Sequence, residues 1–335
     1  MKQTINVAFA FDLNYYRQAV VAISSLLDCA AGKKIAYHIY CLIQSNVTSL
    51  VQKEIKKKIY KKSPDSKIFF INMPDYFSQA YECRGISNAT YYKLMLHRLL
   101  PNVDKIIYSD VDVLFKTDLS EVDDINMDSY YLGAVRDALY NLVEKRKDVC
   151  NRFPYWNTDL KNIGQNYKNG GFLVFNLKKW RQADFDDKII ELSKRNYNFQ
   201  DQDVINILFI NMPETVLILN SKYIVLPSWD YKKSLDENVI THQMYDDILH
   251  RPAILHWAGT KPWDNDALPL ANQWWDYVKN NTPYYDYFKN RLNKEQYKYR
   301  LHIGKFDLFS KRKKDNKRIY RILGIKITIK KPVKK

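Results

Sequence analysis

Two aspartates spaced two residues apart follow an apolar segment of the chain. The segment Ile106–Tyr108 leads into Asp110 and Asp112. Side chains at positions i and i+2 of an extended chain point the same way, so both carboxylates can face one cation. Ligands of open α/β sheets bind beyond the carboxyl ends of the strands, and oxygen donors suit Mg²⁺ or Mn²⁺. The pattern predicts a divalent metal site, with a solvated turn at the end of a strand as the alternative.

A histidine, a glycine and a lysine follow a second apolar segment. His256 ends residues 253–256, and Gly259 and Lys261 come shortly after it. An imidazole can complete a manganese sphere that two carboxylates begin. A lysine can neutralise a phosphate as a point charge, and a glycine allows close backbone approach. A buried structural histidine beside a tryptophan-rich patch is the alternative for His256.

Three more polar groups lie next to predicted elements. Asp12, Asn14 and Tyr15 follow the first strand, where they can read a base and ribose or cap the next helix. Residues 169–171 open a strand, and residues 200–203 precede a helix. Such amides and carboxylates suit sugar hydroxyls, although an acidic first turn is also what the helix dipole favours.

Strand and helix patterns alternate over the first 110 residues, which predicts a mostly parallel sheet with helices on both faces. Beyond residue 110 the pattern loosens, and residues 136–168 are predicted to be a loop excursion lining a site. The predicted strands are 5–11, 35–43, 67–72, 104–108, 131–135, 171–177, 215–219, 223–226 and 253–256. The predicted helices are 15–30, 47–62, 91–100, 178–196, 201–209 and one that begins at 273.

The composition excludes several classes of protein. None of the nine glycines in the 335 residues forms a glycine-rich dinucleotide or phosphate loop. The net charge is +16, but residues 281–335 carry 18 Lys/Arg and 4 Asp/Glu, so the first 280 residues are nearly neutral. A nucleic-acid-binding surface over the whole protein is therefore not expected.

The cysteines and the apolar segments indicate a compartment. The four cysteines are widely spaced and form no C-x-x-C pair, which favours reduced thiols in the cytoplasm. The first apolar run, residues 5–11, is short and predicts a strand rather than a signal peptide. No uninterrupted apolar stretch reaches about 18 residues, so no transmembrane helix is predicted.

Taken together and in order, these motifs resemble the family 8 glycosyltransferases, which include bacterial lipooligosaccharide galactosyltransferases and the glycogenins. The resemblance implies a GT-A fold, which is an α/β fold with a single Rossmann-like, mostly parallel sheet flanked by helices. It also implies retaining transfer of glucose or galactose from a UDP-sugar, with Mn²⁺ or Mg²⁺, to a glycan, glycolipid or glycoprotein acceptor. It covers roughly residues 5–280 and rests on residues 10–15, 90–94, 108–112, 169–180, 200–203 and 256–263.

The resemblance also implies roles for individual residues. Asp110, Asp112 and His256 are the implied metal ligands. Asp201 and Gln202 are the implied catalytic residues; because an amide is a poor nucleophile, front-face attack is favoured, with Asp201 orienting sugar hydroxyls. The stretch from His256 to Lys261 is one residue shorter than is usual in the family. The implied UDP-sugar contacts are Ala10, Asp12, Asn14, Tyr15, Lys93, Asp110, Val111, Asp137, Asn169, Gly170, Gly259 and Lys261.

Two other classes of protein compete with this interpretation. A sugar-nucleotide pyrophosphorylase-like nucleotidyltransferase also uses an α/β sheet and carboxylates, but it usually carries a glycine-rich N-terminal signature. A basic membrane- or nucleic-acid-binding protein without catalysis is the second alternative.

The charge split predicts two parts. Residues 1–280 form the catalytic domain, and the basic and aromatic residues 281–335 form an extension that suits an anionic membrane surface. A solvated, disordered tail is the alternative. The predicted location is cytoplasmic, on the inner face of the membrane, and no nucleic-acid partner is expected.

Overall fold

The computed structural model describes residues 3–83, 85–296, 299–303, 306–314, 317–322 and 325–330, with side chains up to residue 293. The chain forms two compact units, Met1–His256 and Trp257–Lys335. The division at residue 280, between a catalytic domain and a membrane-associating extension, concerns function and stays a prediction.

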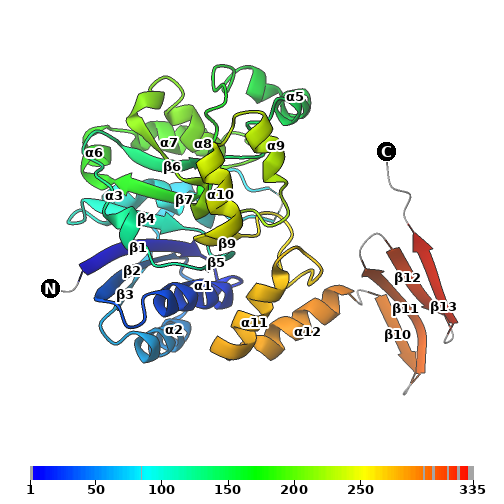
Figure 1. Cartoon of the computed structure of the whole chain (residues 1–335). Helices are drawn as coiled ribbons and strands as arrows, with labels where there is room; N and C mark the ends of the chain where they lie inside the picture. The colour runs from blue at the N-terminus through cyan, green and yellow to red at the C-terminus, as the bar shows by residue number, and fades with distance from the viewer. Residues whose placement is uncertain are drawn as a thin grey trace. The chain divides into compact units, whose positions relative to one another are not determined.

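A seven-stranded sheet forms the centre of the first unit (Figure 1). Its strand order is β3-β2-β1-β4-β7-β6-β8. All neighbouring strands run parallel except that β7 is antiparallel to both β4 and β6. The predicted mostly parallel α/β sheet is therefore confirmed. The strands are β1 (Gln3–Phe11), β2 (Ile35–Ile43), β3 (Lys67–Asn72), β4 (Lys105–Ser109), β6 (Leu132–Arg136), β7 (Lys168–Asn176) and β8 (Val216–Leu219).

Helices flank the sheet, which is why its central strands are almost continuously apolar. In β1, Ile5, Val7, Ala8 and Phe9 have no exposed surface. The α-helices of the first unit are α1 (Tyr16–Cys29), α2 (Ser49–Lys62), α3 (Leu96–Leu99), α4 (Ser120–Asp123), α5 (Val143–Arg152), α6 (Leu177–Gln182), α7 (Asp186–Ser193), α8 (Asp201–Leu208), α9 (Tyr231–Asp236) and α10 (His242–His250).

Two helix predictions were wrong in detail. Residues 91–100 form a 3₁₀ helix, Asn88–Met95, followed by the single turn α3. Five consecutive residues from Tyr91 are buried there, so burial does not follow the α-helical period. Residues 178–196 form α6 and α7, because Asp184 adopts a left-handed φ of 49° that ends the first helix.

Two other segments also differ from prediction. Residues 136–168 contain α5, whose single buried position, Val149, gave no apolar stripe to detect. Residues 223–226 are not a strand: the 3₁₀ helix Ser221–Tyr223 precedes an isolated bridge between Val225 and Leu255.

A small two-stranded sheet brings distant parts of the sequence together. Strand β5 (Val113–Phe115) pairs antiparallel with β9 (Ile254–His256), and Val113 lies opposite His256. The Phe115 N–H donates to the hydroxyl of Ser25 on α1, at 3.0 Å, which fixes β5 against that helix. The residue that follows Asp112 is thus paired with the predicted third metal ligand.

The described part of the second unit contains two α-helices and a four-stranded sheet. Helices α11 (Ala271–Asn281) and α12 (Tyr285–Gln296) pack through aromatic contacts, with the Trp274 and Phe288 ring centroids 4.9 Å apart. The antiparallel sheet has the order β10-β11-β12-β13. Its strands are β10 (Tyr299–Ile303), β11 (Phe306–Lys314), β12 (Lys317–Ile322) and β13 (Ile325–Lys330).

The register of this sheet assigns its residue positions to two faces, because cross-strand partners share a face. One face carries six basic positions, Arg312, Lys314, Lys317, Arg321, Lys326 and Lys330, together with Ser310, Ile319 and Thr328. The opposite face carries six apolar or aromatic positions together with three basic ones, Phe309, Lys311, Lys313, Arg318, Tyr320, Ile322, Ile325, Ile327 and Ile329. Within the described residues, no helix is long and apolar enough to cross a membrane.

Candidate active site

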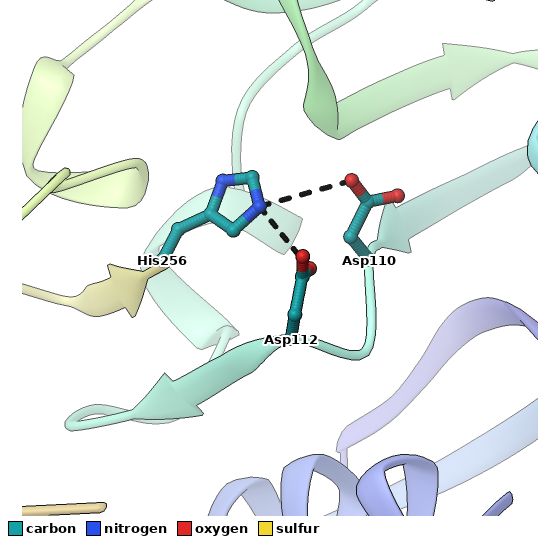
Figure 2. A group of neighbouring side chains, drawn as sticks. All are labelled: Asp110, Asp112 and His256. Carbon is teal, nitrogen blue, oxygen red and sulfur yellow. Dashed lines mark ion pairs between the residues drawn. The ribbon is translucent and has the colours of Figure 1, made fainter. Parts of the chain in front are cut away.

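The three predicted metal ligands meet beyond the carboxyl end of β4. Figure 2 shows the imidazole of His256 facing the carboxylates of Asp110 and Asp112. His256 Nε2 lies 3.1 Å from Asp112 Oδ1 and 3.9 Å from Asp110 Oδ2. One ligand atom from each residue can be chosen so that all three lie within 4.8 Å of one another. The pairing of β5 with β9 creates this proximity across the sequence.

The donor set fits a divalent cation. Two carboxylate oxygens and one imidazole nitrogen suit Mn²⁺, and also Mg²⁺ when the remaining ligands are oxygens. The His256 side chain is only 5% exposed and that of Asp112 is 13% exposed. The carboxylate charge of Asp112 therefore lies in a site with little access to water. A side chain at Gly171 would fill this space, because an added Cβ would lie 2.8 Å from His256 Cε1 and 3.0 Å from Asp110 Oδ2.

A buried lysine connects the cluster to the start of α8. Lys93 is 1% exposed, and its ammonium lies 2.6 Å from Asp201 Oδ2 and 3.6 Å from Asp110 Oδ1. It also donates to the Gly170 carbonyl at 2.8 Å. Burial alone would lower the pKa of Lys93, but Asp110 and Asp201 more than compensate and raise it above its usual value. Lys93 is therefore a charged link between the two carboxylates.

Tyrosine and threonine hydroxyls complete this network. The Tyr108 hydroxyl donates to Asp110 Oδ1 at 2.9 Å, and the ammonium of Lys93 lies 4.4 Å from the centre of the Tyr108 ring. The Thr90 hydroxyl donates to Asp201 Oδ1. Sequence reasoning assigned no role to Thr90 or Tyr108, although both lie in the motifs that carry the family resemblance. Only packing shows that their hydroxyls point at the two aspartates.

The glycine pair lets β7 approach both sides of the site. Gly170 lies against α8, where an added Cβ would lie 3.1 Å from Asp201 Oδ2 and 3.3 Å from Gln202 Cβ. The Gly170 N–H donates to Gln202 Oε1 at 2.8 Å. This contact fixes the amide oxygen of Gln202, so the rest of its amide group is held in a defined orientation. Gly171, the next residue, faces the metal ligands instead.

Asp137 and Asn169 form a buried pair beside the glycines. Asn169 Nδ2 donates to Asp137 Oδ2 at 2.9 Å, and Asn169 Oδ1 accepts from the Gly171 N–H at 2.9 Å. The N–H groups of Leu139 and Tyr140 donate to the other oxygen of Asp137. Burial raises the pKa of Asp137 despite these bonds. Asp137 and Asn169 therefore have fixed orientations next to the cluster.

The predicted nucleoside contacts lie in a turn directly before α1, whose N-cap residue, Tyr15, makes no capping hydrogen bond with its side chain. Asp12 Oδ1 accepts the N–H groups of Asn14 and Tyr15, at 2.8 and 3.2 Å, just before α1. Ala10 is half-buried near the end of β1, and Val111 is buried beside Asp110. This turn is compatible with ligand binding, and the nucleoside role of these residues stays a prediction.

Gly259 and Lys261 belong to the second compact unit. Gly259 has a φ of 87°, which glycine adopts without strain. The ammonium of Lys261 donates to the Trp257 carbonyl at 3.0 Å. The phosphate contacts that the family resemblance implies for both residues stay predictions.

Asp203 has a structural role that its position in the Gln200–Asp203 motif did not reveal. It has no exposed surface and accepts from the hydroxyls of Tyr155, at 2.7 Å, and Tyr167, at 2.6 Å, and from the Phe199 N–H, at 2.9 Å. These bonds join the segment after α5 to the start of α8. The richness of residues 136–168 in aromatics was the only sequence signal for this contact.

The fold is the GT-A fold, as comparison with solved structures shows. A solved galactosyltransferase, LgtC, in complex with donor and acceptor sugar analogues superposes with a TM-score of 0.68 at 24% identity, over 86% of this chain and 100% of that chain. A bifunctional glycosyltransferase, WbbM, gives a TM-score of 0.69 at 22% identity, over 87% of this chain and 52% of that chain, so this chain spans about half of it.

The family follows from the sequence comparison. The model of glycosyl transferase family 8 matches residues 6–267, and the chain belongs to that family. A lipopolysaccharide 1,2-glucosyltransferase of Escherichia coli K12 is 28% identical over 291 residues, which cover 85% of this chain and 80% of the relative. The predicted family and the GT-A fold are therefore confirmed.

We expect Gly171→Ala to weaken the binding of Mn²⁺ by about 10- to 100-fold, the range known for disturbed metal-site partners. The added Cβ would push apart the His256 ring and the Asp110 carboxylate. Titration calorimetry with Mn²⁺ alone measures the effect. Gly133→Ala is the matched control, because its Cβ would meet Val174 and Leu219 in the sheet instead. Equal Mn²⁺ affinities for the two variants would contradict the prediction.

We expect Asp203 to make folding more favourable as the pH falls. Burial raises the pKa of Asp203 to about 6, against about 3.9 in an unfolded chain. The folded state therefore binds the proton more tightly, and this stabilisation is lost as the pH rises through about 6. Between pH 5 and 7 the wild type should lose ~1 kcal/mol of unfolding free energy relative to Asp203→Asn. Urea unfolding at several pH values tests this, and parallel pH profiles would contradict it.

Proposed function

We propose that this glycosyltransferase transfers glucose or galactose from a UDP-sugar to a glycan, glycolipid or glycoprotein acceptor, with retention of configuration and with Mn²⁺ or Mg²⁺. The observation that carries the proposal is the cluster of Asp110, Asp112 and His256 beyond the end of β4. The names of a lipopolysaccharide glucosyltransferase and of a solved galactosyltransferase among the similar proteins favour a hexose donor. Synthesis of a surface polysaccharide or glycoconjugate is the process that fits best.

In this proposal, Asp110, Asp112 and His256 hold the divalent cation. A bound cation supplies positive charge to the leaving diphosphate, which lowers the barrier to its departure. Tyr108 and Lys93 fix the carboxylate of Asp110 from the other side. Lys261 adds a further positive charge to the diphosphate, and Gly259 gives the backbone room for it.

On the nucleoside side of the donor, Asp12, Asn14 and Tyr15 contact the uridine. Their backbone is held in one conformation by the turn at Asp12. Ala10, at the end of β1, and Val111, beside the metal ligands, line the same donor.

The sugar-binding side consists of groups with fixed orientations. Asp137, Asn169 and Gly170 contact the hexose, and Asp201 orients its hydroxyls while Lys93 and Thr90 hold that carboxylate. The sugar acquires oxocarbenium character as the diphosphate leaves, as in glycoside hydrolysis. Gln202 is an amide and a poor nucleophile, so the acceptor hydroxyl attacks from the face that the diphosphate leaves. The leaving phosphate oxygen then takes the proton of the acceptor.

The direct test is release of UDP from UDP-glucose and UDP-galactose, with and without Mn²⁺. We expect metal-dependent release in the wild type and a loss of about 100-fold or more in Asp110→Asn, the scale of removing one charge-stabilising group. Asp104→Asn is the matched control, because this carboxylate is 73% exposed and pairs with Arg181 on the surface. Full metal-dependent activity in Asp110→Asn would contradict the site assignment.

The same assay separates the competing functions. A pyrophosphorylase-like nucleotidyltransferase would form UTP from a UDP-sugar and pyrophosphate, and it would not release UDP. A binding protein without catalysis would do neither, and RNA binding with a steep salt dependence would favour that alternative.

For the location of the enzyme, we propose the cytoplasmic side of the membrane, with the four-stranded sheet of the second unit on an anionic lipid surface. The face with six basic positions supports this, because each Lys or Arg near such a surface contributes about 1 kcal/mol. A membrane-bound position would bring the enzyme to a lipid-linked acceptor.

We expect the full chain to co-sediment with phosphatidylglycerol-containing vesicles. Replacing Arg312, Lys314 and Lys317 by Gln should weaken binding at least about tenfold, because three attractive charges are lost. The control with the same net charge replaces Lys56, Lys57 and Lys61, which are exposed on α2. Equal vesicle binding by the two triple variants would contradict the role of the basic face.

A further inference from the structure

Two lysines of the first unit are buried to the same extent but differ in their surroundings. Lys93 and Lys168 are each 1% exposed. The ammonium of Lys93 meets two carboxylates and a carbonyl. The ammonium of Lys168 has no hydrogen-bond partner within the described part of the chain. Burial, and next the charge of Arg136, lowers the pKa of Lys168 to about 8, whereas the pKa of Lys93 is raised.

A second cation lies directly opposite Lys168. Arg136 is the last residue of β6, Lys168 is the first residue of β7, and the two are cross-strand partners at an irregularity in the register. Such bulges re-aim side chains next to active sites. The Nε atom of Arg136 is also buried with no partner among the described residues, and its Nη2 makes a long contact of 3.4 Å with Asn166 Oδ1. Like charges directly opposite each other destabilise a sheet.

This position is rigidly built and adjoins the proposed sugar contacts. Asn206 on α8 bonds both the N–H and the carbonyl of Lys168, at 2.7 and 2.9 Å, so the start of β7 cannot shift freely. The residue after Lys168 is Asn169 and the residue after Arg136 is Asp137, and these two are hydrogen-bonded to each other. In the sequence, the cation pair is therefore directly followed on both segments by a pair of proposed sugar contacts.

A buried, unpaired ammonium facing a guanidinium lowers the stability of the fold. An anion bound between the two cations would offset this loss of stability. We propose that Arg136 and Lys168 bind an anionic group, a carboxylate or a phosphate ester, that one of the two sugar substrates carries. Arg136 offers the planar fork that suits either group, and Lys168 adds a point charge on a flexible stem. The inference rests on the proposed function for a UDP-sugar donor and a sugar acceptor, and an anionic donor would replace the glucose or galactose of that proposal.

The first experiment measures thermal unfolding of the full chain with and without inorganic phosphate, in the absence of UDP and divalent cations. We expect phosphate to raise the melting temperature of the wild type by several degrees. Lys168→Met should melt higher than the wild type without phosphate, because the unpaired charge is gone, and should lose the response to phosphate. The matched control, Lys178→Met, removes an exposed lysine of α6 and should respond as the wild type does.

A second variant keeps the test decisive if Lys168→Met folds poorly. Arg136 is only half-buried, so Arg136→Gln should fold and should also reduce the response to phosphate. The proposal is overturned if phosphate does not stabilise the wild type. It is equally overturned if the variants at positions 136 and 168 respond as Lys178→Met does, which would locate the phosphate elsewhere.

The second experiment identifies which substrate carries the anion. Calorimetry compares UDP-glucuronate with UDP-glucose as donors, and methyl glucuronoside or glucose 6-phosphate with methyl glucoside in the presence of UDP and Mn²⁺. In the donor pair or in the acceptor set, we expect the anionic compound to bind at least about tenfold more tightly than the neutral one. In Lys168→Met, the ratio of these two affinities should fall towards one. If the wild type binds anionic and neutral compounds with equal affinity in both the donor and the acceptor comparison, the assignment of the anion to a substrate is overturned.

The two proposals can fail separately. The phosphate measurement needs no donor and no turnover, so an enzyme that releases no UDP can still show the anion site. Conversely, metal-dependent UDP release without a phosphate response would leave the proposed function intact and would remove the anion site.

Discussion

The contact between Lys93 and its two aspartates is the interaction on which the rest of the site depends. Nearby negative charge stabilises a buried ammonium, and here it is provided by Asp110, just after β4, and Asp201, at the start of α8. The same ammonium holds the Gly170 carbonyl on β7. One charge thus ties two strands and a helix together, and it fixes the proposed metal side and the proposed sugar side relative to each other.

The close approach of β7 is the second constraint. Gly170 and Gly171 face opposite sides of one strand, and a side chain at either position would collide with functional groups. The first glycine brings the backbone against Asp201 and Gln202, and the second leaves room between Asp110 and His256. Beside them, Lys168 opposes Arg136, and its ammonium has no hydrogen-bond partner among the described residues, whereas the ammonium of Lys93 lies near two carboxylates. The two lysines are equally buried, but the charge of Lys93 stabilises the fold, whereas the charge of Lys168 is proposed to bind an anionic ligand.

Much of the fold was predictable because local periodicity and turn chemistry decide single elements. The strands and helices of the first 110 residues follow from alternation. Only residues 91–100 differed, where a 3₁₀ helix is buried on successive positions and shows no α-helical period. The errors beyond residue 110 have local causes that no periodicity reveals. Asp184 ends a helix through a left-handed φ, and α5 buries only Val149, so its sequence carries no apolar stripe.

The sequence by itself determined the order of the motifs, the family they resemble and the concentration of positive charge after residue 280, because these depend on residue types and spacing alone. Only the tertiary structure decided which distant residues meet. His256 joins Asp110 and Asp112 through the register of β9 on β5. Asp203 became a structural anchor and Lys168 an unpaired cation because of what packs around them. Contacts between distant residues depend on strand register and burial. Neither of these can be predicted from a short segment of the sequence.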